Sequence, residues 1–196
     1  MRVLLGRKST RYFSTEGISL KDLSELLTLS CGLFDSEQET DAHCTIKRTY
    51  PSAGGRYPIE VYPVVLRSND LVKGIYHYNV ADNTLELIKA GDYTAQTKDF
   101  YSNQSLELDI DFPCLILCTM VFDRTMEKYC EKGYRFILLD AGHMGQNLYL
   151  VAEYLGLGIV GLGAGTHSDD YIDELLGLHH HEENFFYGFA VGYPMK

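Results

Sequence analysis

The stretch YRFILLDAGHMGQNLYLVAEYLGLG, residues 134–158, constrains the fold of this chain more than any other segment. Apolar residues recur in it at helical spacing, which predicts a helix over residues 136–155. Further apolar side chains lie on the other sides of this helix, so we expect it to be buried on several sides. The stripe at helical spacing consists of Ile137, Ala141, Met144, Leu148, Val151 and Leu155. A single chain of 196 residues would struggle to cover such a helix alone.

Four glycines lie within this helix or at its end. Gly142 and Gly145 weaken helix propensity, which is tolerable where another backbone packs closely against that face. Gly156 and Gly158 are expected to end the helix, a common role of glycine at helix C-termini.

The rest of the chain alternates helices and strands without a strict βαβ rhythm, which predicts an α+β fold in a single domain, residues 1–196. Ser19 is expected to cap a helix over residues 19–32. Its face should carry Leu20, Leu23, Leu26 and Leu27. Strands are expected at 59–67, 74–80, 84–90, 112–122 and 185–193, with a further helix near 169–177. Pro63 predicts an edge strand or a bulge, and residues 35–50 and 156–165 read as loops, while 92–108 are helical or irregular.

Composition excludes several classes of protein. A net charge of −10 disfavours nonspecific binding to nucleic acid, and no apolar run is long enough to span a membrane. The short apolar stretch at the N-terminus does not match a signal peptide. Five cysteines without metal-ligand spacing favour reduced thiols, so we expect a cytoplasmic protein without a metal site.

Two polar clusters suggest chemistry. Within five residues near the N-terminus, the chain carries three cations and a hydroxyl: Arg7, Lys8, Ser9 and Arg11. Such donors suit a phosphate, although a basic run is more often simply solvated. Further along, Lys128 and Tyr129 can act as proton-transfer groups, since burial or a nearby cation can make a lysine a base. The commoner meaning of that run is an exposed helix face, with alternating Glu and Lys over 127–132.

Two glycine-rich segments can approach a ligand closely. Residues 51–55, Pro-Ser-Ala-Gly-Gly, form a turn of small residues or a plain loop before a strand. Residues 161–165 lack the Lys-Ser/Thr of a phosphate-binding loop. Gln146 and Asn147, on the predicted helix, are ligand donors or satisfied core amides.

Several of these motifs, in this order, resemble the FMN-dependent nitroreductase superfamily and, within it, the SagB-type dehydrogenases of thiazole and oxazole peptide biosynthesis. The resemblance runs over nearly the whole chain. It rests on RKSTRYF (7–13), PSAGGRYPIEVY (51–62), GIYHY (74–78), Lys128-Tyr129, residues 134–158, DELLGL (173–178) and VGYP (191–194). It implies a central, mostly antiparallel sheet flanked by helices, an intertwined homodimer and non-covalently bound FMN.

The resemblance also implies which residues hold the cofactor. The N-terminal cluster is expected to bind the FMN phosphate, with Lys8 contributing through its backbone, and the two glycine-rich segments to lie near the flavin ring. The residues so assigned are Arg7, Lys8, Ser9, Arg11, Pro51, Ser52, Ala53, Gly54, Gln146, Leu162, Gly163, Ala164 and Gly165. Many members carry another cation after the GYP turn, and we expect either Lys196 or the N-terminal cluster to replace it here.

The reaction implied is dehydrogenation of an azoline ring in a small molecule or modified peptide, with Lys128 as the base and Tyr129 as its partner. Two alternatives stay open at this point. One is an NAD(P)H-dependent reductase of nitro compounds or quinones, which needs no side-chain base. The other is a non-catalytic flavin-fold subunit that acts as a binding or accessory protein.

Overall fold

The computed structural model describes residues 2–34, 47–101, 111–163, 169–179 and 181–195. Within them, six strands form one sheet in the order β3-β2-β1-β4-β6-β5, and all neighbouring strands are antiparallel. The strands are β1 (Ile59–Val65), β2 (Gly74–Asn79), β3 (Thr84–Ala90), β4 (Cys114–Val121), β5 (Gly158–Leu162) and β6 (Glu183–Gly192). The expected α+β fold with a mostly antiparallel central sheet is therefore confirmed.

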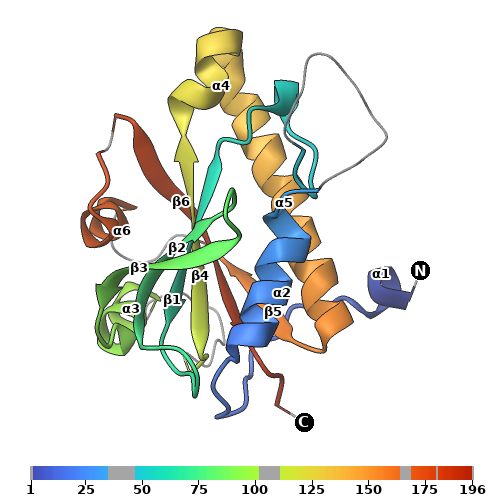
Figure 1. Cartoon of the computed structure of the whole chain (residues 1–196), viewed down its shortest axis with the longest axis vertical. Helices are drawn as coiled ribbons and strands as arrows, with labels where there is room; N and C mark the ends of the chain where they lie inside the picture. The colour runs from blue at the N-terminus through green and yellow to red at the C-terminus, as the bar shows by residue number, and fades with distance from the viewer. Residues whose placement is uncertain (1, 35–46, 102–110, 164–168, 180, 196) are drawn as a thin grey trace.

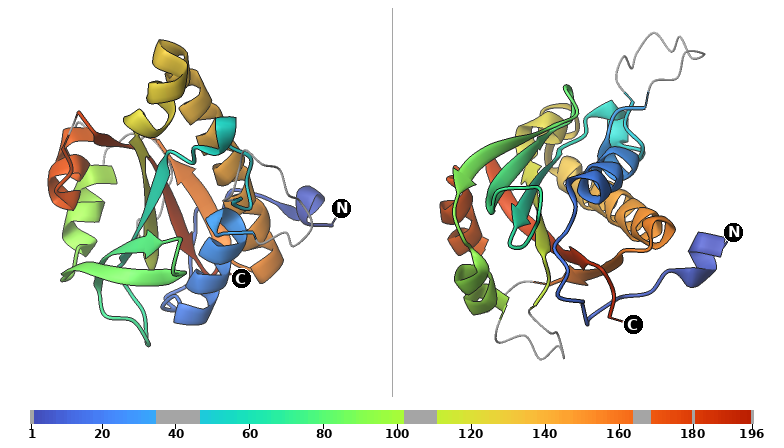
Figure 2. Two further views of the ribbon diagram at one scale, coloured as in Figure 1. Left: turned by 45° about the horizontal axis from the view of Figure 1, so that its top comes forward. Right: turned by 60° about the horizontal axis from the view of Figure 1, so that its bottom comes forward.

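Helices cover both faces of the sheet (Figures 1 and 2). On one face lie α2 (Leu20–Cys31) and α5 (Gly133–Leu155), and on the other lie α3 (Thr94–Tyr101) and α6 (Asp169–Leu176). At the margins are α1 (Arg2–Gly6), α4 (Phe122–Tyr129) and the short 3-10 helices η1 (Ala53–Gly55) and η2 (Cys130–Lys132). Because side chains alternate along a strand, each face of the sheet builds its own hydrophobic core.

The helix α2 forms as its sequence predicts. Ser19 accepts a hydrogen bond from the backbone N–H of Asp22, which satisfies a donor that the first turn leaves unpaired. Leu23, Leu26 and Leu27 are fully buried, whereas Leu20, in the first turn, is exposed.

The long helix α5 also forms, but in one chain it is not buried all round. Its buried face carries Ile137, Ala141, Met144 and Leu148, while Leu138 and Leu139 are exposed. Gly145 packs against a side chain, the Phe189 ring, rather than against a backbone, and Gly142 faces open space. The helix ends at Gly156, whose φ of 74° is left-handed and favours glycine.

The prediction from Pro63 was wrong, because β1 is an internal strand between β2 and β4. The ladder between β1 and β2 joins only Val64 to Ile75 and Val65 to Gly74. Pairing with β2 therefore stops beside Pro63, where the backbone nitrogen has no hydrogen to donate.

The prediction of a loop over 156–165 was also wrong, since residues 158–162 form the edge strand β5. Ile159 and Val160 pair with Val191 and Ala190 of β6, as suits their β-branched side chains. Gly161 is required for packing rather than for a turn, because a side chain there would collide with the hydroxyl of Tyr187. None of the described helices is long and apolar enough to cross a membrane.

Candidate functional site

The segment of small residues before β1 is held by a carboxylate of α5. Ser52 donates a hydrogen bond to the carboxylate of Asp140 and accepts one of 2.8 Å from the backbone N–H of Tyr57. The N–H of Ala53 also donates to Asp140, at 3.2 Å. The hydroxyl of Ser52 therefore shapes the loop 52–57, and Asp140 fixes this loop to the helix.

The electrostatics of Asp140 follow from its position. Burial raises the pKa of Asp140 above its ordinary value, and this outweighs the lowering effect of the hydrogen bonds from Ser52 and Ala53. Burying the charged carboxylate of Asp140 costs free energy, and the hydrogen bonds from Ser52 and Ala53 offset part of this cost.

Lys128 and Tyr129 converge on the loop 52–57. A side-chain carbon placed on Gly54 would lie 2.6 Å from the hydroxyl of Tyr129 and 3.0 Å from the amine of Lys128. The Lys128 amine also lies 5.3 Å from the centre of the Tyr129 ring. Lys128 is exposed and Tyr129 half-buried in the single chain. Gly54, with a φ of 64°, thus gives both polar groups the space to reach this surface.

The N-terminal cluster meets α5 at a different residue. The Ser9 hydroxyl lies 3.3 Å from the hydroxyl of Tyr149, and the Arg7 guanidinium lies 5.2 Å from the centre of its ring. Lys8 lines an open pocket of about 260 Å³ together with Thr10 and Tyr149 itself. Arg11 is exposed. Arg7, Lys8 and Ser9 therefore all lie near Tyr149.

Tyr149 joins this cluster to the end of β5. Its hydroxyl accepts a hydrogen bond of 2.7 Å from the backbone N–H of Gly161. Leu162 follows, fully buried, and Gly163 is exposed. Ala164 and Gly165, which were also predicted to approach the flavin, lie outside the described residues.

The two amides of α5 separate into different environments. The side chain of Asn147 donates to the backbone carbonyls of Ser30 and Thr49, at 3.3 and 3.1 Å. It is therefore a satisfied core amide that ties α5 to α2. Gln146, in contrast, is exposed, as is Pro51.

The predicted site residues thus form two groups that contact α5. The groups differ in their position along the helix axis and in the side of the helix that they contact. The loop group, around Gly54, contacts Asp140, and the N-terminal group, around Ser9, contacts Tyr149. Nine helical residues correspond to a rise of about 14 Å and a rotation of roughly 180°. In a single chain the two groups therefore face opposite sides of α5.

Sequence reasoning missed the two residues that organise these groups. Asp140 and Tyr149 both lie within the apolar helix, where a carboxylate and a hydroxyl among Leu and Ala were not considered as candidates. The available signal was the buried position of Asp140 in the 3.6-residue pattern, three residues after Ile137. A carboxylate placed there requires donors from elsewhere in the chain.

Comparison with known proteins identifies relatives over almost the whole length. The profile of the nitroreductase family matches residues 4–193. A nitroreductase-type protein of Methanocaldococcus jannaschii is 28% identical over 176 residues, which cover 90% of this chain and 83% of that protein.

Two further comparisons are with proteins of the microcin B17 system. The microcin B17-processing protein McbC of Escherichia coli is 32% identical over 117 residues, which cover 58% of this chain and 43% of McbC. In the solved structure of the E. coli microcin synthetase McbBCD complex with truncated pro-MccB17 bound, one chain superposes with a TM-score of 0.80. That chain is 23% identical, and the match covers 97% of this chain and 70% of that one, so it establishes a shared fold.

The raised pKa of Asp140 predicts a pH-dependent contribution to stability. Because the folded chain holds the proton more tightly than the unfolded chain, lowering the pH stabilises the fold until the ordinary Asp value of about 4 is passed. Relative to Asp140→Asn, the wild-type free energy of unfolding should therefore rise as the pH falls from about 7 to about 4. Urea denaturation across this range measures it, with the exposed Asp123→Asn as the control. A difference from Asp140→Asn that does not change with pH would contradict the prediction.

Proposed function

The chain belongs to the nitroreductase family, and from this premise we propose that it oxidises an azoline ring in a peptide-derived substrate. It is an FMN-dependent oxidoreductase. The observation that carries the more specific proposal is the convergence of Lys128 and Tyr129 on Gly54. Dehydrogenation of an azoline needs a base beside the ring carbon, and these two side chains supply proton-transfer groups at the loop expected to approach the flavin.

The residues of the N-terminal group fit the phosphate of FMN. Within the described part of the chain, Arg7 and Arg11 form no ion pair with a carboxylate. Their charges are thus available to a phosphate, and the hydroxyl of Ser9 adds a donor beside them. Tyr149 would hold the N-terminal group of residues in place, since it contacts Arg7 and Ser9 and accepts a hydrogen bond from Gly161.

We infer further that the FMN site is completed by a second copy of the chain. The loop group and the N-terminal group face opposite sides of α5, so one chain does not direct both toward one planar ring. The exposed face of α5 presents Leu138, Leu139 and Gly142, and α1 presents Leu4 and Leu5. A second copy packed on this apolar face would bring its own loop group toward the N-terminal group of the first.

Placing a charge on this face tests the homodimer. Leu139→Lys should give a folded chain of about 22 kDa that no longer pairs and retains little FMN, because burying a lysine in an apolar interface is costly. Light scattering at micromolar concentration and flavin absorbance measure the two effects. Leu29→Lys, on the exposed side of α2, is the matched control and should leave both unchanged. A monomeric wild type that still binds FMN would rule out the shared site.

The phosphate role of the N-terminal group predicts a specific loss. Arg11→Ala should weaken FMN binding roughly ten- to a hundredfold, since it removes a charge-assisted hydrogen bond worth about 1.5–3 kcal/mol. Titration of the apoprotein with FMN, followed by flavin fluorescence, measures this. Arg2→Ala removes the same charge from α1 and should bind FMN like the wild type. Equal affinities for Arg11→Ala and the wild type would remove Arg11 from the site.

In the proposed reaction the azoline loses two hydrogens. The chemistry that bound FMN supplies is acceptance of a hydride from the ring. Lys128 is the proposed base that takes the proton from the ring carbon, and Tyr129, next to it, holds the substrate or relays the proton. The exposed position of Lys128 in one chain leaves room for a substrate to reach its amine.

A peptide-derived substrate is supported by the relationship to McbC, a processing protein of a peptide microcin. The matched part of this chain spans less than half of McbC. The main rival is an NAD(P)H-dependent reduction of nitro compounds or quinones, in which hydride arrives at the flavin from the nucleotide and no side-chain base is required.

Anaerobic stopped-flow mixing separates the two reactions. An azoline-containing peptide should bleach the flavin absorbance of the wild type. The rate should fall at least roughly a hundredfold in Lys128→Ala and Tyr129→Phe, the usual size of a lost general base. Both variants should retain FMN. Lys132→Ala and Tyr134→Phe are the matched controls, because both residues are exposed near the pair, and they should react like the wild type.

Rapid bleaching by NADPH that Lys128→Ala does not alter, without bleaching by the azoline peptide, would establish the reductase instead. If neither NADPH nor the azoline peptide reduces bound FMN, the result would favour the alternative of a non-catalytic flavin-fold subunit.

A further inference from the structure

The helix that carries Lys128 and Tyr129 is weakly anchored by its own sequence. Among the eight residues of α4, only Thr125 is buried, and the residue before the helix provides no side-chain cap. A helix of two turns is marginal in water by itself. It ends at Cys130, whose φ of 49° and ψ of −144° are unfavourable for any residue except glycine. Tertiary contacts must therefore set the position of α4.

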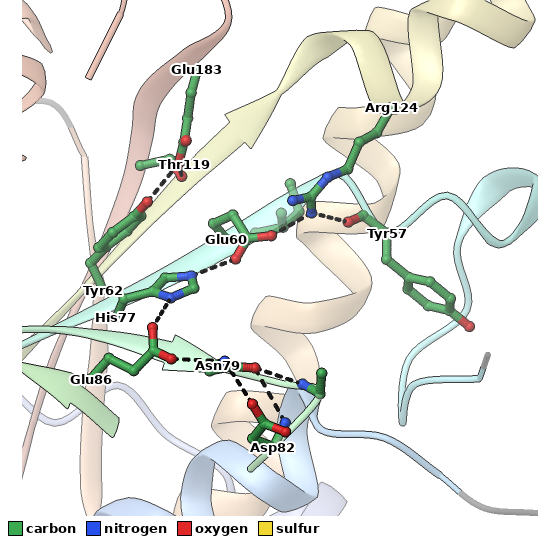
Figure 3. Close-up of polar contacts among 12 residues, drawn as sticks. Tyr57, Glu60, Tyr62, His77, Asn79, Asp82, Glu86, Thr119, Arg124 and Glu183 are labelled. Carbon is green, nitrogen blue, oxygen red and sulfur yellow. Dashed lines mark hydrogen bonds and ion pairs between the residues drawn. The ribbon is translucent and has the colours of Figure 1, made fainter. Parts of the chain in front are cut away.

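Phe122 and Met126 pack α4 against the core, and the side chain of Arg124 adds polar contacts to the sheet (Figure 3). Its Nη1 donates to the backbone carbonyl of Tyr57, at 3.1 Å, and forms a short ion pair with the carboxylate of Glu60. Tyr57 belongs to the loop 52–57 and Glu60 to β1, so a single guanidinium joins three parts of the fold.

Glu60 is itself fixed from the other side. Its second carboxylate oxygen lies 2.7 Å from Nε2 of His77 on β2, and Nδ1 of His77 lies 3.4 Å from Glu86 on β3. Burial raises the pKa of Glu60, but the bonds from His77 and Arg124 outweigh it and leave the pKa below the ordinary value. The acceptor for Arg124 is thus an ionised carboxylate with little freedom to move, on an internal strand.

The contacts of Arg124 connect α4, which carries the proposed catalytic pair, to the loop 52–57 that the pair faces. Arg124 donates to the carbonyl of Tyr57, and the loop 52–57 then leads back to Gly54. Gly54 faces the hydroxyl of Tyr129, which lies about one and a half turns after Arg124 in α4. Tyr57 has a φ of 47° and is held also through its N–H, by Ser52. Arg124 thus connects the loop that carries Gly54 to the helix that carries Tyr129. It does so in addition to the Ser52–Asp140 bond, which holds the loop, and the Phe136 ring, which packs on Tyr129.

The geometry points to Arg124 as a positioning residue for the proposed azoline oxidation: it holds α4 against the loop 52–57 so that Lys128 and Tyr129 meet the substrate in a fixed arrangement. This inference rests on the proposed function. Small displacements of reacting groups cost much in rate, so the effect belongs in kcat rather than in substrate affinity. The guanidinium of Arg124 acts through α4 and is not required to touch substrate or FMN.

Kinetics of the FMN-loaded protein test this with Arg124→Ala. With dioxygen supplied as the acceptor that reoxidises the flavin, its kcat for the azoline peptide should fall roughly ten- to a hundredfold, with KM and FMN content within about twofold of the wild type. Guanidinium ion at millimolar concentration should restore part of kcat, because Arg124 lines two open pockets, of about 710 and 420 Å³, through which the ion can reach its position. The same concentration of sodium chloride should not.

Arg56→Ala is the matched control. Arg56 lies in the next position of the loop after Gly55, and its only described ion pair is an exposed contact of 4.0 Å with Glu127. Arg56→Ala removes the same charge from the same surface and keeps the bonds of Arg124 to Tyr57 and Glu60. The exposed pair with Glu127 that it breaks also joins the loop to α4 but contributes little, so kcat should stay unchanged. Because Arg124→Ala leaves Glu60 without its arginine, the double variant Arg124→Met/Glu60→Gln provides a second test. It removes the buried charge as well and should show the same loss of kcat.

Amide hydrogen exchange in α4 supplies a measurement that needs no substrate. Arg124→Ala should speed exchange over residues 122–129, and Arg56→Ala should not. A wild-type kcat in Arg124→Ala, or unchanged exchange in α4, would overturn the positioning role. A rise in KM with kcat preserved would also overturn it and make Arg124 a substrate contact. If the wild type fails to oxidise azoline peptides, the proposed function falls, and the exchange measurement alone then decides whether Arg124 holds α4.

Discussion

The packing of α5 against the sheet is the constraint on which the rest of the structure depends. Its buried face inserts Met144 and Leu148 into the core, and Gly145 lets the Phe189 ring of β6 approach closely. Once this face is fixed, the positions of Asp140 and Tyr149 are fixed as well. Each then organises a separate segment of the chain, so a core helix also serves as the scaffold of the site.

Local patterns were sufficient to predict most of the fold. The cap at Ser19, the apolar run of β4 and the hairpin between β2 and β3 all depend on residues close in sequence, and the structure confirms them. Predictions failed where a distant partner decides the outcome. Pro63 is tolerated inside the sheet because the ladder to β2 ends beside it, and β5 exists because β6 pairs with it.

The same limit applies to the candidate site. Basic and small residues in the segments 7–11 and 51–55 could be selected from the sequence because their composition suits an anion and a planar ring. The contacts that hold those segments could not be predicted in this way. Asp140 acts on a loop nearly ninety positions away, and Arg124 on Tyr57 and Glu60 more than sixty positions away, so neither contact leaves a local pattern.

The ion pair between Glu60 and Arg124 has an evolutionary consequence. Glu60 is almost fully enclosed, so losing Arg124 alone would leave its charge with His77 as its remaining described partner, and losing Glu60 alone would release the guanidinium from the sheet. Neither single substitution is an easy intermediate. Drift at these two positions should therefore proceed in concert, and among descendants of this chain the pair should be inherited or replaced as a unit.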